Sequence, residues 1–208
     1  MSDTCVRELQ KPTRELVEKH VKIFEADDWR VATDKALDGL FRAFPCNCRI
    51  EEVYLKVVAL DDLYSTQLRR GRKDASALWD IAKEICQLTI DSELAQRLPG
   101  VVDRIAAVTV GGKRCGYVFA SKYCHFHAPD DYPICENDVV EPLVYAYQQL
   151  DGLEVRHDDL TKNYPRYKEA VESLRSRYNV ADIGFRQFDK FLLGYGKEWK
   201  QSAQNERK

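Results

Sequence analysis

Apolar residues recur at helical spacing along almost the whole chain, and this pattern limits the fold more than any other feature. Positions 37, 40, 41 and 44 follow the i, i+3, i+4, i+7 rule, with Thr33 or Asp34 as the expected N-cap. Strand-like stretches such as residues 107–110 are too short to predict a sheet. The sequence therefore predicts an all-α protein, with further helices at residues 16–24, 51–63, 78–85, 113–126, 139–150, 167–178 and 185–199.

The composition supports one helical domain. The chain has 208 residues, 44% of them hydrophobic, which is enough to build a sizeable core. We expect residues 1–200 to form a single domain of two closely packed lobes, and the polar tail, residues 201–208, to fray. No run approaches the roughly 20 apolar residues of a membrane span, and we see no secretion signal. Seven unevenly spaced cysteines favour reduced thiols and a cytoplasmic protein, which we expect to be a monomer.

Two basic segments that contain glycine precede predicted helices. LRRGRKDAS spans residues 68–76, and TVGGKRCG spans residues 109–116. Free N–H groups at a helix N-terminus attract anions, and glycine lets an anion approach them closely. The net charge is only −2, so a local basic stripe matters more than the total. We therefore expect a phosphate-binding surface, with ordinary solvated loops as the alternative; its members would be Arg69, Arg70, Arg72, Lys73, Gly111, Gly112, Lys113 and Arg114.

The stretch SKYCHFHAPDDYPICENDVVEPL, residues 121–143, concentrates groups that titrate or hold a proton. Lys122 and His125 lie at i, i+3, so they share one face of a helix that two prolines then stop. The chain has room to turn back before a second helix begins near Asn137. The two helices should form two walls of one pocket, with Glu136 and Asp138 facing Lys122 and His125. Asn137 or Asp138 could instead serve only as a helix cap.

The same stretch holds four residues of the type that binds zinc. Cys124, His125, His127 and Cys135 could in principle supply the ligands. Their spacing matches no common structural zinc site, and neighbouring residues point about 100° apart on a helix. We therefore expect no bound metal and no cofactor.

Two motifs are similar to those of helix-hairpin-helix DNA glycosylases. Residues 98–101, Leu-Pro-Gly-Val, resemble the hairpin that presents backbone amides to a DNA phosphate, although Val102 stands where that pattern has a second glycine. The segment from Pro133 through Glu136 to Val139 resembles the loop that leads to the superfamily's acidic residue. Residues 54–66, 119–140 and 188–197 are similar to divergent bacterial members. The chain therefore resembles a divergent bacterial member of this superfamily.

This resemblance implies a two-lobed, all-α fold with a DNA-facing cleft and the activity of a DNA N-glycosylase. Such an enzyme would remove a modified base, either in repair or in bacterial defence against phage DNA. The superfamily's aspartate is replaced here by Glu136, with Asp138 as the other candidate acid. Lys122 could act as an amine nucleophile or pair with an acid. We favour a monofunctional enzyme, because the family's catalytic lysine lies in the hairpin.

A flipped base would enter the cleft and meet residues able to stack on it or hydrogen-bond to it. An ionised Glu136 or Asp138 would stabilise the oxocarbenium-like sugar and could activate the attacking water. The alternative is a non-catalytic helical DNA-binding or protein-interaction module, in which these acids are caps and solubilising charge. The expected base pocket consists of Tyr64, Tyr123, His125, Tyr132 and Asn137.

Overall fold

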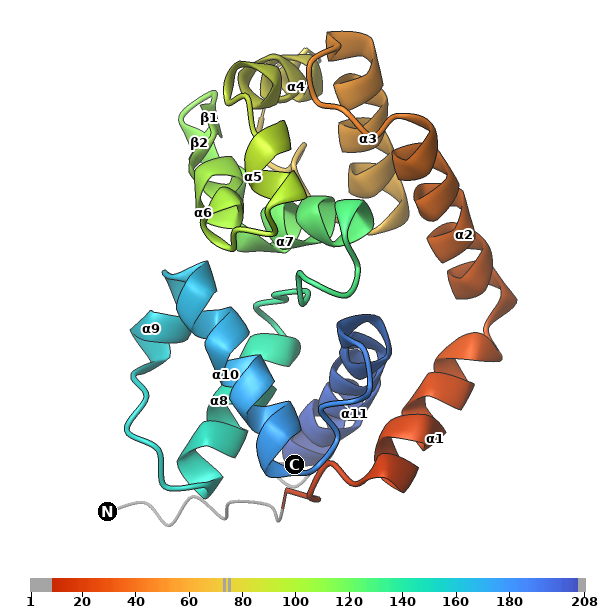
Figure 1. Ribbon diagram of the computed structural model, residues 1–208, viewed down its shortest axis with the longest axis vertical. Coiled ribbons are helices and arrows are strands. Elements are labelled where there is room, and N and C mark those ends of the chain that lie inside the picture. The colour runs from red at the N-terminus through yellow and green to blue at the C-terminus, as the bar shows by residue number, and fades with distance from the viewer. Residues whose placement is uncertain (1–8, 73, 75, 206–208) are drawn as a thin grey trace.

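The computed structural model describes residues 9–72, 74 and 76–205 (Figure 1). This part of the chain is built almost wholly from α-helices, which confirms the all-α prediction. The helices are α1 (Arg14–Glu25), α2 (Asp28–Ala43), α3 (Ile50–Leu63), α4 (Ala77–Gln87), α5 (Asp91–Ala95), α6 (Gly100–Ala107), α7 (Gly116–His127), α8 (Val140–Leu150), α9 (His157–Thr161), α10 (Tyr164–Arg177) and α11 (Phe185–Asn205). One antiparallel hairpin joins β1 (Thr109–Val110) to β2 (Lys113–Arg114).

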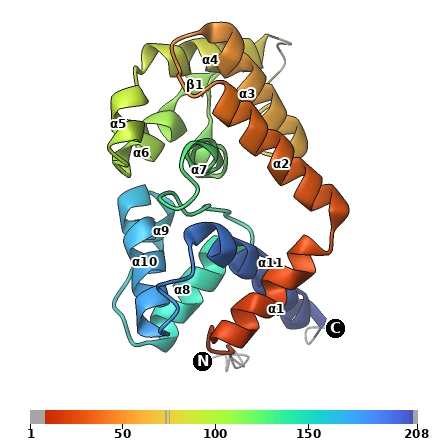
Figure 2. The ribbon, with the colours of Figure 1, turned by 45° about the vertical axis from the view of Figure 1, so that its right-hand side comes forward.

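The helices form two groups, which we call the upper and lower lobes after their places in Figure 1. The upper lobe contains α2 to α7 and the hairpin, and the lower lobe contains α1 and α8 to α11 (Figures 1 and 2). Helix α1 lies along α11, so the two ends of the described chain share the lower lobe. The chain passes between the lobes at residues 26–27 and again through residues 128–139.

Each lobe is held by the apolar faces that the sequence pattern marks. In the upper lobe Leu37 and Phe41 of α2 are buried with the inward side chains of α3 and α7. In the lower lobe Phe188 and Phe191 of α11 are fully buried. Fully burying one such side chain contributes about 1.5–3 kcal/mol, so these faces fix where the polar sides of α7 and α11 point.

The expected capping of two helices is wrong. Helix α2 begins at Asp28 because the side chain of Asp27 accepts the Arg30 N–H at 3.2 Å, so Thr33 and Asp34 lie inside the helix. At α8 the N-cap position is Val139, without a side-chain cap. Neither Asn137 nor Asp138 therefore caps this helix.

The segment after residue 108 also differs from the expectation of a helix starting at Lys113. Gly111 and Gly112 have φ values of +59° and +73°, and they form the tight turn of the β1–β2 hairpin. A two-residue hairpin turn needs positive φ at both central positions, which Gly-Gly supplies without strain. Lys113 and Arg114 therefore lie on a strand, and α7 starts at Gly116.

At the other end of the chain, α11 continues to Asn205, so residues 201–205 of the tail expected to fray are helical, and residues 206–208 lie outside the described part. Across the described residues, no helix combines the length and the apolar character that crossing a membrane requires.

Candidate active site

A cavity of about 270 Å³ is lined by residues of both lobes. The upper lobe contributes the start of α2, the end of α3 and one face of α7. The lower lobe contributes the end of α1, the start of α8 and a stripe of α11. Ile134 and Glu136 reach the cavity from the connecting segment, residues 128–139. The volume lies just below the range of about 300–1,000 Å³ that is typical of small-molecule pockets.

The polar face of α7 lies where the sequence predicts. Lys122 and His125 both line the cavity, one helical turn apart, and Glu136 returns to meet them. Tyr64, at the end of α3, lines it too. Lys122, His125 and Glu136 therefore line one cavity, but Glu136 lies on the connecting segment and only Val140 of α8 reaches the lining, so the second wall is not the helix that the sequence suggests.

Four other predicted site residues lie outside the cavity lining. Tyr123 is fully buried in the upper lobe, where its hydroxyl donates to Asn47 Oδ1 at 2.5 Å. The hydroxyl of the buried Tyr132 donates to the Leu98 carbonyl at 3.3 Å. The expectation that these tyrosines contact a bound base is corrected, because the core already packs around them. Asn137 and Asp138 are exposed, and they do not line the cavity either.

Lys122 and Glu136 form an ion pair in the cavity wall. The Nζ atom of Lys122 lies 3.5 Å from Glu136 Oε1 and 3.3 Å from the Tyr64 carbonyl oxygen, and 5.4 Å from the centre of the Tyr64 ring. Lys122 is only 3% exposed, and burial lowers its pKa against the opposing effect of the Glu136 carboxylate. The carboxylate is 29% exposed, so it is more accessible to a ligand than the Lys122 ammonium.

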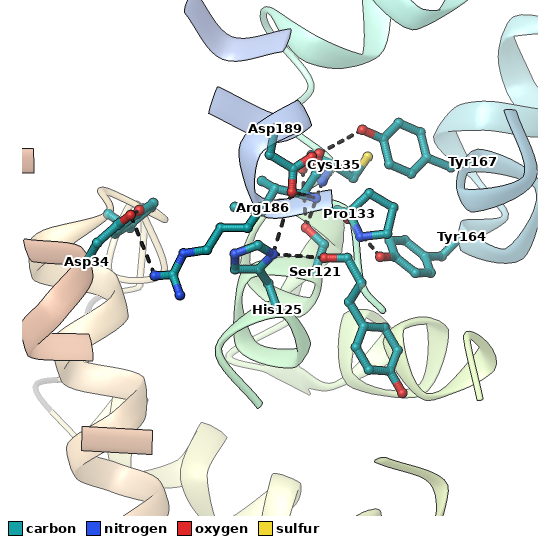
Figure 3. Close-up of polar contacts among 12 residues, drawn as sticks. Asp34, Ser121, His125, Pro133, Cys135, Tyr164, Tyr167, Arg186 and Asp189 are labelled. Carbon is teal, nitrogen blue, oxygen red and sulfur yellow. Dashed lines mark hydrogen bonds and ion pairs between the residues drawn. The ribbon is translucent and has the colours of Figure 1, made fainter. Parts of the chain in front are cut away.

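His125 and Asp189, two buried residues of the cavity lining, lie next to each other (Figure 3). His125 Nδ1 lies 2.9 Å from the Tyr132 carbonyl oxygen and 3.5 Å from Asp189 Oδ2. A carbonyl only accepts, so Nδ1 carries the proton and Nε2 is an acceptor in the neutral ring. Burial lowers the pKa of His125 to about 4, so the imidazole is uncharged at neutral pH. Burial also raises the pKa of Asp189, against the effect of the Ile134 N–H that its carboxylate accepts.

A second charged group of the cavity lining comes from the lower lobe. Arg186 of α11 pairs across the lobes with Asp38 at 2.7 Å and with Asp34 at 3.6 Å. The Tyr64 hydroxyl also donates to Asp34; burial, together with this carboxylate, raises the pKa of that hydroxyl. These contacts fix Asp34 as a structural acid of the cavity wall, not the helix cap that the sequence suggests.

Sequence reasoning missed the contribution of α11. Five of its residues line the cavity at positions i, i+3, i+4, i+7 and i+11, opposite the buried apolar face of the same helix. That spacing was visible in the sequence, but a charged stripe usually faces solvent. The stripe consists of Arg186, Asp189, Lys190, Leu193 and Lys197. With Arg30 and Lys122, basic residues outnumber acidic ones in the lining, where Asp34, Glu136 and Asp189 are the acids.

The two basic segments meet at one end of the upper lobe. The guanidinium of Arg72 donates to the carbonyl oxygens of Lys113 at 2.9 Å, Arg114 at 3.2 Å and Val110 at 3.3 Å. It also donates to the Leu68 carbonyl. Lys113 Nζ returns a hydrogen bond to the Arg70 carbonyl at 3.3 Å. Arg72 therefore joins the turn after α3 to the β1–β2 hairpin. Its guanidinium is already used by these four carbonyls, so the expectation that it contacts a phosphate is wrong.

The remaining basic residues of these segments stand toward solvent. Arg70 and Arg114 are exposed, as are the turn residues Gly111 and Gly112. Arg69 is exposed and pairs with Asp62 at 3.3 Å and Asp61 at 3.7 Å. Lys73 lies outside the described residues.

No group of three or more His, Cys, Asp or Glu residues in the described part of the chain is arranged to hold a metal ion. Of the four residues considered for zinc, Cys124 is buried in the core and His127 Nε2 lies 3.5 Å from Lys56 Nζ. A lysine ammonium at that distance competes with a cation for the same nitrogen.

Comparisons with known proteins place the chain in a family without giving it an activity. An uncharacterized protein of Haemophilus influenzae (strain ATCC 51907 / DSM 11121 / KW20 / Rd) is 28% identical over 158 residues, which are 75% of this chain and 72% of that protein. No solved structure matches the chain. The family model HI_0787_N, described as an N-terminal domain, matches residues 16–131, which run from α1 through α7 and stop before Glu136. Because that match covers more than half of its length, the chain belongs to the HI_0787_N family.

Proposed function

We propose that this protein is a DNA N-glycosylase that removes a modified base, with the cavity between the lobes as its active site. The observation that carries the proposal is the Lys122–Glu136 pair in the cavity wall, with Glu136 Oε1 3.5 Å from a lysine that is almost fully buried. An acid fixed in this way can act on a bond held in the cavity, whereas an acid on the open surface would only contribute to solubility.

The size and lining of the cavity suit a single flipped nucleotide. A cavity of about 270 Å³ has room for one heterocyclic base. Trp29 lies at the start of α2, lines the cavity and is 64% exposed, so its ring is available to stack at the mouth. His125 Nε2 offers an acceptor in the lining, and the excess of basic residues favours a ligand that carries phosphate.

The chemistry requires one carboxylate close to the sugar. As the N-glycosidic bond breaks, its electron pair leaves with the base and the sugar becomes positively charged. The ionised Glu136 stabilises that charge, and it accepts a proton from the water that adds to the sugar carbon. Lys122, whose Nζ lies 3.5 Å from Oε1, holds the carboxylate in place. Asp138 is less suited to this role, because it is exposed and outside the cavity lining.

The basic end of the upper lobe would hold the DNA backbone. Arg69, Arg70, Lys113 and Arg114 are exposed around the hairpin, where backbone N–H groups of the Gly111–Gly112 turn are also accessible. A duplex held there and bent toward the cavity would present its flipped nucleotide to Glu136. The basic stripe of α11 adds positive charge on the other side of the cavity.

A screen of duplex oligonucleotides, each with one modified base at a defined position, tests the proposal. We expect abasic sites, revealed by alkaline strand cleavage, in at least one duplex, with the free base identified by mass spectrometry. A monofunctional enzyme should give no strand break before alkali. DNA binding without base release from any duplex would support the alternative of a non-catalytic DNA-binding module. Absence of both binding and release would favour a protein-interaction module.

A further inference from the structure

The connecting segment just before Glu136 is held by side chains at each of four successive residues. These contacts come from α7, α10 and α11, so three helices converge on residues 132–135 (Figure 3). The contacts are His125 Nδ1 to the Tyr132 oxygen at 2.9 Å, Tyr164 hydroxyl to the Pro133 oxygen at 2.7 Å, Tyr167 hydroxyl to the Ile134 oxygen at 2.7 Å, Ile134 N–H to Asp189 Oδ2 at 3.0 Å, and Cys135 N–H to Ser121 Oγ at 3.0 Å.

These contacts replace the secondary structure that the segment lacks. Residues 132–136 belong to no helix or strand, yet Tyr132, Pro133 and Cys135 are buried. Buried backbone groups of an irregular segment need partners, since each unpaired group costs about 1–3 kcal/mol. Side chains provide those partners here, and each one also fixes the path of the chain.

Glu136 is fixed from its other side as well. Its carbonyl oxygen accepts the N–H groups of Val140 and Glu141, each at 3.0 Å, and so joins the segment to the first turn of α8. Four residues, 136–139, separate the clamped segment from α8, and hydrogen bonds hold the chain at both ends of this short stretch, which leaves the backbone of Glu136 little freedom. The path of the backbone therefore directs the Glu136 carboxylate toward Lys122, in addition to the attraction between the two charges.

In the described part of the chain, Asp189 is the one acid of the cavity lining that contacts this segment directly. It is 7% exposed, its Oδ2 atom binds the Ile134 N–H, and its Oδ1 atom is buried without a hydrogen-bond partner among the described residues. Burying a carboxyl group costs free energy, so the stability of the fold gives no reason for an acid at this position. The Asp189 Oδ2 atom lies close to both His125 Nδ1 and the Ile134 N–H, and it accepts the Ile134 hydrogen bond, which a leucine of similar size could not do.

We infer that Asp189 and Tyr167 are positioning residues that set the location of the Glu136 carboxylate through residues 132–135. For catalysis this inference rests on the proposed glycosylase function, whereas the positioning itself does not. A misplacement of about 1 Å at a reacting group lowers turnover by about a hundredfold. We therefore expect loss of either contact to lower kcat much more than it changes KM.

The chain offers matched controls for both residues. Tyr147 is fully buried like Tyr167, and its hydroxyl also donates to a backbone carbonyl at 2.7 Å, but that carbonyl belongs to Gln10, far along the sequence from Glu136. Glu141 is a buried acid of the same lobe, at 2% exposure; its side chain pairs with His157 at 3.0 Å, and alanine there keeps the backbone N–H that bonds to the Glu136 carbonyl. The pairs to compare are therefore Tyr167→Phe with Tyr147→Phe, and Asp189→Ala with Glu141→Ala.

Amide hydrogen exchange over residues 132–138 tests the positioning without any substrate. We expect faster exchange of this segment in Tyr167→Phe and Asp189→Ala than in their controls, at matched global stability. Asp189→Asn keeps an oxygen for the Ile134 N–H and should restore slow exchange. Equal exchange in each variant and its control would overturn the inference.

Kinetics on the DNA substrate found by base release test the catalytic consequence. We expect kcat to fall by about a hundredfold in Tyr167→Phe and in Asp189→Ala, while KM is retained. Both control variants should keep kcat near the wild-type value, and Asp189→Asn should recover it. If the wild type releases base and Tyr167→Phe matches Tyr147→Phe, the positioning role fails while the glycosylase stands. If exchange responds as expected and no DNA loses a base, the positioning stands while the proposed function fails.

Discussion

Replacing Arg72 and Arg70 in turn should separate stability from DNA binding at the basic end of the upper lobe. The two arginines are two residues apart, yet their guanidinium groups are engaged differently. Arg72 donates to four backbone carbonyls and joins the turn after α3 to the β1–β2 hairpin. Arg70 is exposed, and its guanidinium bonds to Gln67 Oε1 at 2.9 Å. Methionine at either position keeps most of the stem and removes the charge.

The magnitudes follow from these contacts. Each hydrogen bond from a charged donor contributes about 1.5–3 kcal/mol when buried and less when partly exposed, as here. We therefore expect Arg72→Met to lower the free energy of unfolding by about 2–4 kcal/mol and Arg70→Met to change it by less than about 0.5 kcal/mol. For a DNA-bound protein, loss of one phosphate contact reduces the slope of log K against log salt by about 0.9.

Urea unfolding followed by circular dichroism measures the first effect, and fluorescence anisotropy with labelled duplex DNA at several salt concentrations measures the second. Arg70→Met should reduce the salt slope while leaving the unfolding midpoint unchanged. An Arg72→Met variant as stable as the wild type would refute its role as a clamp. An unchanged salt slope in Arg70→Met would remove that residue from the phosphate-binding surface.

Three further predictions concern other parts of the molecule. Between pH 6.5 and 4 the unfolded chain binds a proton at His125 that the folded chain excludes, so wild-type stability should fall by about 3 kcal/mol more than that of His125→Gln as the pH is lowered through this window; parallel pH profiles would contradict the shift. Gly196→Ala should destabilise by about 1–3 kcal/mol, because the new methyl would lie 2.7 Å from Val139 Cγ1, whereas Gly39→Ala meets nothing within 4 Å and should stabilise by about 0.5–1 kcal/mol; thermal melts that rank them the other way would refute the packing. Trp29→Ala should leave the melting temperature unchanged and weaken DNA binding by about 1–3 kcal/mol, and unaltered affinity would exclude stacking at the cavity mouth.

The sequence predicted helices well where an apolar face repeats. The patterns at residues 51–63 and 78–85 lie within or beside α3 and α4, and the pattern at residues 185–199 lies within α11. These predictions succeeded because burial of one face decides helix position largely by itself. The pocket between Lys122 and Glu136 was also foreseeable, since the prolines limit where the chain can go.

Elsewhere the sequence carried too little information. Thr33 and Asp34 have the chemistry of caps, but Asp27 competes for the same role six residues earlier. Gly111-Gly112 suits a loop or a hairpin equally, and two-residue strands leave no alternating pattern to detect. Asp189 and Arg186 act through partners more than fifty residues away in the chain, which only the tertiary fold brings together.

The rate of base release by Glu136→Gln, measured in single turnovers with enzyme in excess over DNA, tests the central claim most directly. The substitution removes the charge with little change of volume, so we expect DNA affinity and the melting temperature to be retained. Release should fall by about two to three orders of magnitude, the loss typical of removing a group that stabilises transition-state charge. Asp138→Asn, an equally conservative change of an exposed acid two residues away, should release base at the wild-type rate. Wild-type release by Glu136→Gln would contradict the claim that the cavity acid performs the reaction.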